Sequence, residues 1–169
     1  MGLLRRLDAA ARAGFPGVFT VFLIILGAVP VGIPGIIGAV ALPCIFFWTV
    51  FRPAAMPAPV VFSIGLLQDL LSFAALGTGV LTLLIVHGVA LRLRDFLVRQ
   101  SFLMAWVMFC GFAASAGALG WGLQAVLGWH LPSAAPGLHQ FGIAVGLYPA
   151  LAWVLTRVHT AMQRAETAL

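Results

Sequence analysis

Long uncharged apolar runs, separated by short segments with arginine, proline or glycine, set the pattern of this chain. No charged residue stands between Phe15 and Phe51. A single helix of that length would measure about 55 Å, against a hydrocarbon core of about 30 Å in a bilayer. The cluster Pro30-Val-Gly-Ile-Pro-Gly35 favours a turn, so two short spans are predicted at 16–30 and 35–51.

The rest of the chain repeats this alternation. Four further spans are predicted, at 60–71, 80–91, 101–123 and 139–155. Pro43 and Pro149 stand within two of the six spans, where proline is expected to kink a helix. The pattern therefore predicts an all-α integral membrane fold with six short transmembrane helices.

The two ends of the chain are more polar than the spans. Residues 2–13 place leucines on one helical side and charged residues on the other, which favours a helix lying in the headgroup layer. A frayed tail is the alternative for this segment, and Gly14, Pro16 and Gly17 are expected to end it. The predicted organisation is an interfacial segment at 1–14, a six-helix membrane domain at 15–157 and a cytoplasmic tail at 158–169.

Composition supports membrane insertion. Hydrophobic residues make up 63% of the 169-residue chain and charged residues 8%, whereas a soluble domain carries about 25% charge. All nine cations are arginine, and they stand outside the predicted spans, in the segments between them and at the two ends of the chain. We therefore expect the net charge of +5 to set membrane orientation next to anionic lipid, with no nucleic acid as a partner.

The arginines predict the topology. With six spans and the N-terminus inside, all nine fall on the cytoplasmic side, and the segments near 31–34, 72–79 and 124–138 contain none. Five spans would put Arg52 and later cations on the wrong sides. The sequence therefore predicts a multi-pass protein with both termini in the cytoplasm.

Asp69 is the acid that stands inside an apolar run. It shares a helical face with Gly65 and Ser72, at steps of four and three. A carboxylate at the bilayer centre costs about 2.5–3.5 kcal/mol on insertion scales, so it should face protein or a wet cavity. One interpretation is that Asp69 anchors a helix contact or a site. The other is that it lies near a membrane face and reaches water.

Catalytic and metal-binding motifs are missing from the sequence. No His, Cys, Asp and Glu cluster has metal-ligand spacing, and there is no GxSxG elbow or phosphate loop. With four acids in all, paired-carboxylate catalysis is not expected either. His87 stands alone within a span, either packed and hydrogen-bonded or as a proton relay. We expect no enzymatic activity, no metal and no cofactor.

Three short motifs carry a family resemblance. Gly65-Leu-Leu-Gln-Asp69-Leu-Leu-Ser72, then Leu76-Gly77, then Ala90-Leu-Arg-Leu-Arg94 resemble the rod shape-determining protein MreD family. Flanking residues are also similar to that family: Pro43 with Trp48 and Pro53, and Gly146 with Pro149 and Arg157. One departure is Ala75, where the family often has proline before Leu-Gly.

The resemblance implies a non-enzymatic scaffold of the bacterial cell-elongation machinery, in the cytoplasmic (inner) membrane. Its implied partners are MreC first, then the MreB filament, a RodA-type glycosyltransferase and a penicillin-binding transpeptidase of peptidoglycan synthesis. The helix pair at 59–94 would be the docking face. The expected partner-binding residues are Gly65, Asp69, Ser72, Leu76 and Gly77, and the expected cytoplasmic basic surface is Arg92, Arg94 and Arg99.

The family is also similar in fold to the S subunits of energy-coupling-factor transporters, which implies an alternative function. A small-molecule-binding membrane transporter component would need a wet pocket with convergent polar groups. The predicted outer segments offer Gln124, His130, His139 and Gln140 for it.

Overall fold

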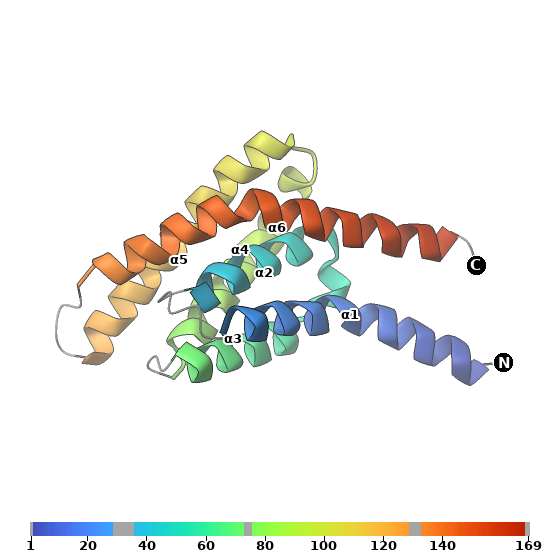
Figure 1. The fold of residues 1–169 in the computed structure, drawn as a ribbon, viewed down its shortest axis with the longest axis horizontal. Coiled ribbons are helices and arrows are strands. Elements are labelled where there is room, and N and C mark those ends of the chain that lie inside the picture. The colour runs from blue at the N-terminus through green and yellow to red at the C-terminus, as the bar shows by residue number, and fades with distance from the viewer. Residues whose placement is uncertain (1, 29–35, 73–75, 129–132, 168–169) are drawn as a thin grey trace.

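A computed structural model describes the backbone of residues 2–28, 36–72, 76–128 and 133–167, with side chains described from 14 to 164 within these ranges. Over the described residues the chain forms six α-helices and one short 3-10 turn (Figure 1). They are α1 (Gly2–Ala28), α2 (Ile36–Phe51), η1 (Pro53–Ala55), α3 (Ala58–Ser72), α4 (Thr78–Leu97), α5 (Phe102–Gly128) and α6 (Ala135–Thr167).

The predicted number and order of helices are confirmed, including the division of the first long apolar run into α1 and α2. The predicted turn at 30–35 lies outside the described residues. The predicted helix end at Gly14, Pro16 and Gly17 is wrong, because α1 continues through all three. Proline removes one backbone donor, and here packing offsets the loss: Gly17 is buried, and a Cβ added there would lie 3.1 Å from Val60 of α3.

Several other boundaries differ from the prediction. α5 continues to Gly128 and α6 begins at Ala135, although a loop was expected at 124–138. Arg92 and Arg94 lie within α4, although a loop was expected from residue 92. A basic side chain suits the last turn of a helix, where it faces unpaired carbonyl groups. α6 continues to Thr167, so the expected tail at 158–169 is helical over most of its length.

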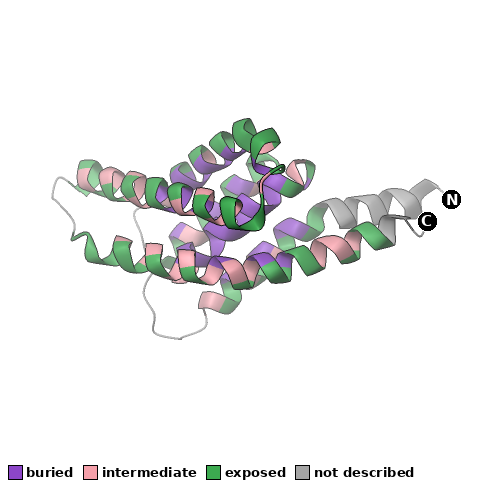
Figure 2. Ribbon diagram, turned by 90° about the horizontal axis from the view of Figure 1, so that it is seen from above, coloured by how far each residue is buried: buried purple, intermediate pink, exposed green. Residues whose placement is uncertain are grey.

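α2 is the central helix of the bundle. Every residue from Gly38 to Val50 is buried, and α1, α3, α4, α5 and α6 all contact the helix. Figure 2 shows the buried positions gathered in the middle of the molecule. At 16 residues α2 is about 24 Å long, shorter than the hydrocarbon core. Its neighbours therefore cover an apolar surface that would otherwise be exposed.

Aromatic side chains join α2 to the two longest apolar helices. Phe46 of α2 packs against Phe109 and Phe112 of α5, with ring centroids 5.4 and 5.0 Å apart. Phe109 stacks on Tyr148 of α6 at 4.2 Å. These contacts hold α5 and α6 to the centre of the bundle.

Pro149 lies inside α6, and its missing N–H leaves the carbonyl of Val145 without a helical donor. The indole Nε1 of Trp106 on α5 donates a hydrogen bond to that carbonyl oxygen at 3.2 Å. An indole N–H is a donor only, so the two groups match. The proline thus creates an acceptor that ties α6 to α5.

One end of the bundle carries the arginines. Arg94 Nε donates to the Val50 carbonyl at 3.0 Å, which places the end of α4 beside the end of α2. The ring centroids of Phe51 and His159 are 6.1 Å apart, so the C-terminal part of α6 lies at this end of the bundle too. Figure 1 shows the start of α1 and the end of α6 at the same end of the bundle.

Two helical segments of the described chain, Phe102–Gly128 and Ala135–Arg164, are long and apolar enough to cross a membrane. Shorter apolar helices are Gly14–Ala28, Ile36–Phe51 and Ala58–Ser72. That all six helices cross a bilayer stays a prediction. The side of the membrane on which each loop lies also stays a prediction.

Candidate functional site

Asp69 is buried near the end of α3, with 2% of its surface exposed. Its Oδ2 accepts a hydrogen bond from the Gly77 N–H at 2.8 Å, and its Oδ1 accepts one from the Gly79 N–H at 2.9 Å. The Val80 N–H lies 3.4 Å from Oδ2 and completes a set of three backbone donors. The carboxylate therefore binds the first turn of α4.

This position has a clear physical basis. The first N–H groups of a helix have no partner within the helix, and the partial positive charge there favours an anion. The backbone of Gly77, whose N–H donates to Asp69, is left-handed, with φ at +97°. Glycine adopts this conformation without strain. Asp69 thus faces protein, and three donors of its own chain stabilise the carboxylate.

Gly65 completes the joint between α3 and α4. A Cβ added at Gly65 would lie 2.7 Å from the Cα of Val80, closer than real Cβ atoms come to a backbone atom. Gly65 and Asp69, which were expected to contact a partner protein, thus pack against α4 of the same chain. Gly65 and Asp69 are buried in this contact, so a partner protein would not touch them directly.

The other predicted partner-binding residues remain accessible. Ser72, Leu76 and Gly77 are exposed at the tip of the α3–α4 pair, and Leu76 has 66% of its surface exposed. Of the predicted basic surface, Arg92 and Arg99 are exposed, and Arg94 is half-buried by its bond to Val50. The structure thus separates the two predicted groups, at opposite ends of α4.

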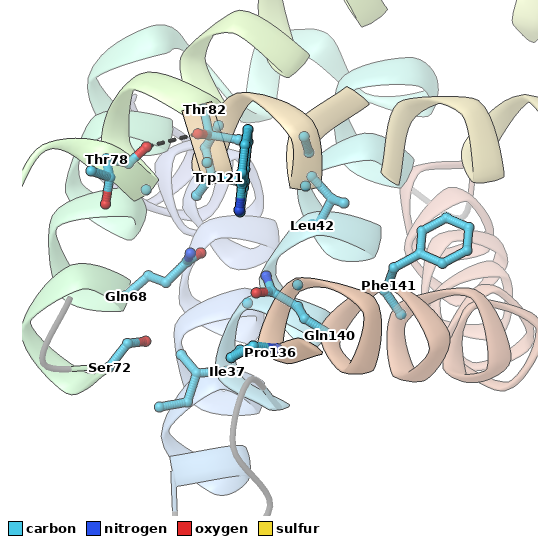
Figure 3. Close-up of a pocket in the computed structure, with 18 of the residues that line it drawn as sticks. Ile37, Leu42, Gln68, Ser72, Thr78, Thr82, Trp121, Pro136, Gln140 and Phe141 are labelled. Atoms are coloured by element: carbon cyan, nitrogen blue, oxygen red, sulfur yellow. Dashed lines mark hydrogen bonds between the residues drawn. The ribbon is translucent and has the colours of Figure 1, made fainter. Parts of the chain in front are cut away.

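A cavity of about 480 Å³ lies beside the Asp69 cap (Figure 3). Its walls come from the start of α2, the end of α3, the start of α4, the end of α5 and the start of α6. These ends are opposite to those that carry Val50 and Arg94. The polar residues that line the cavity are Gln68, Asp69, Ser72, Thr78, Thr82, Gln124, Ser133 and Gln140.

Gln68 and Gln140 reach this cavity from opposite walls, and Figure 3 shows their side chains pointing toward one another. Gly38 of α2 makes room for both. A Cβ added at Gly38 would overlap Nε2 of Gln140 and lie 3.4 Å from Nε2 of Gln68. A Cβ at Gly79 would lie 3.1 Å from the same Gln68 atom. The missing side chains of Gly38 and Gly79 therefore leave the space that the Gln68 and Gln140 amides occupy.

The sequence pointed to only part of this cavity. Gln124 and Gln140 were expected in a pocket and line it, whereas His139 is not among the lining residues and His130 lies outside the described ones. Gln68 was missed, although a glutamine next to a buried aspartate in an apolar run was a usable signal. Trp121 of α5 also lines the cavity.

His87 is hydrogen-bonded and packed. Its Nδ1 lies 2.8 Å from Oγ1 of Thr49, and both side chains are buried between α4 and α2. Among the described residues, no group of three or more His, Cys, Asp and Glu side chains could hold a metal ion.

Comparisons with protein-family models, with curated proteins and with solved structures give no match for this chain.

Proposed function

We propose that this chain is a non-enzymatic scaffold subunit of the bacterial cell-elongation machinery, similar to MreD, in the cytoplasmic membrane. The observation that carries the proposal is the Asp69 cap. The residues on which the family resemblance rests form one structural unit, because Asp69 and Gly65 lock α3 onto α4. A rigid pair of helices of this kind can present a fixed surface to another protein.

The exposed tip of this pair is the proposed contact. Leu76 is a large apolar side chain with little protein around it, next to exposed Ser72 and Gly77. MreC, as the first partner implied by the resemblance, would bind there. The arginine end of the bundle would face the cytoplasm, where the positive-inside rule places it and where the MreB filament lies. Links to the glycosyltransferase and the transpeptidase would pass through this assembly.

Co-purification with the MreC of the same organism tests the proposal. Leu76→Ser should reduce recovered MreC several-fold without lowering the thermal stability of the chain. Leu127→Ser is the matched control, since Leu127 of α5 is also strongly exposed, at 58%. Undiminished MreC recovery with Leu76→Ser, or an equal loss with Leu127→Ser, would refute the proposed contact.

The cavity supports a second candidate function, a small-molecule-binding membrane subunit of the transporter type. Its volume is within the range of about 300–1,000 Å³ that is usual for ligand pockets. Several polar side chains converge on it from five helices. A rise in melting temperature with an added small metabolite, lost on Gln68→Met, is the test of this function.

A further inference from the structure

Gln68, which lines the cavity, carries an unsatisfied polar atom. Oε1 of Gln68 is buried and has no hydrogen-bond partner within the part of the chain that the structure describes. Leaving a buried acceptor unpaired is unfavourable by about 1–3 kcal/mol, so such atoms are usually paired. Gln140 faces it across the cavity, and each amide offers both a donor and an acceptor. A ligand group that both accepts and donates would complete the arrangement.

The charges of the walls restrict the ligand. Asp69 is the charged side chain among the described residues that line the cavity, and no arginine lines it. Both Asp69 oxygens already accept backbone N–H groups. An anionic ligand would therefore lie near a carboxylate with no cation to offset the repulsion. The walls thus disfavour an anion, and the Asp69 oxygens, both already paired with backbone N–H groups, offer little to a cation. An uncharged molecule fits these walls best.

The rest of the lining favours a flat apolar part. The Trp121 side chain extends toward the space between Gln68 and Gln140 (Figure 3). Leu42 and Phe141 add apolar surface. Indole rings stack on planar groups, and such pairs contribute about 0.5–1.5 kcal/mol beyond their buried area.

We propose that this cavity is a binding site for a small uncharged molecule with a carboxamide on a planar ring. The Gln68 amide turns so that Oε1 accepts from the carboxamide N–H, and the carboxamide carbonyl accepts from the Gln140 amide. The ring lies against Trp121. This inference rests on the second candidate function and is independent of the scaffold proposal, because binding to the cavity and recovery of MreC are separate measurements.

Equilibrium dialysis of the full chain in detergent, with labelled nicotinamide and labelled nicotinate, tests the site. The two probes share one ring and differ in carrying a neutral amide or a carboxylate. We expect saturable, one-to-one binding of nicotinamide and at least tenfold weaker binding of nicotinate. Gln68→Met and Gln140→Met should each weaken nicotinamide binding about tenfold, the usual effect of one lost hydrogen bond in a buried site. Gln100→Met, in the turn after α4, is the matched control and should bind as the unchanged chain does.

Several outcomes would overturn the inference. No saturable binding of nicotinamide by the unchanged chain would remove the ligand class. Equal binding of nicotinate would remove the charge argument. Unchanged binding by either glutamine variant would mean that the probe binds elsewhere. Melting curves show whether each variant is folded. If Gln68→Met fails to fold, a folded Gln140→Met protein still tests the site.

Discussion

Gly65 of α3 lies so close to Val80 of α4 that an added Cβ would stand 2.7 Å from the Val80 Cα. The atom in the way belongs to the backbone, so no side chain can rotate to relieve the overlap. The spacing of α3 and α4 thus depends on the missing side chain. Because Asp69 caps α4 one helical turn further along α3, the same spacing sets the length of its three hydrogen bonds.

Gly65→Ala should destabilise the folded chain by about 1–3 kcal/mol, because the two helices must move apart. Unfolding in mixed micelles with increasing SDS, followed by circular dichroism, measures the change. Gly88→Ala is the matched control, since nothing lies within 4 Å of a Cβ at that position of α4. It should be neutral or stabilise by up to about 1 kcal/mol, as alanine favours a helix over glycine. Equal effects of the two substitutions would contradict the close contact.

Asp69→Asn should lower the free energy of unfolding by about 1–3 kcal/mol, because one carboxylate oxygen is replaced by an amide that cannot accept. Asp69→Leu should lower it further, since all three N–H groups of α4 then lose their acceptor. Asp95→Asn is the control: its side chain is 94% exposed, and its pair with Arg94 at 4.0 Å should contribute little. Full stability of Asp69→Leu, with MreC recovery alone reduced, would assign Asp69 to a partner and not to the cap.

Trp106→Phe should lower stability by about 1 kcal/mol, because the Val145 carbonyl loses the indole donor. Pro149→Ala restores a helical N–H for that carbonyl. A double-mutant cycle in the same unfolding assay should therefore show that the tryptophan substitution has a smaller effect in the Pro149→Ala background. Strict additivity of the two changes would show that the indole and the proline act independently.

Arg94→Met should lower stability by about 1 kcal/mol, since Arg94 Nε donates to the last turn of α2 through the Val50 carbonyl. Arg94→Lys keeps the charge near that helix end and should restore only part of the loss, because an ammonium group lacks the guanidinium geometry. Arg92→Met, at an exposed position of the same helix, is the control. A loss as large with Arg92→Met would mean that total charge, and not this bond, is responsible.

The sequence by itself determined the number and order of the helices. Hydrophobic runs, prolines and arginines are local signals, so the division into α1 and α2 and the break between α3 and α4 could be predicted from neighbouring residues alone. The same local reasoning failed at Pro16, where packing of Gly17 against α3 keeps α1 continuous. The pattern also marked Asp69 as unusual without naming its partner.

Only the tertiary structure decided what these residues contact. The donors to Asp69 are backbone N–H groups of the next helix, which carry no sequence signature. The cavity unites Gln68 of α3 with Gln140 of α6, more than seventy positions apart in the sequence, because five helix ends pack together there. Periodicity within a helix indicates which face is buried, but the neighbour that covers this face depends on how all the helices pack.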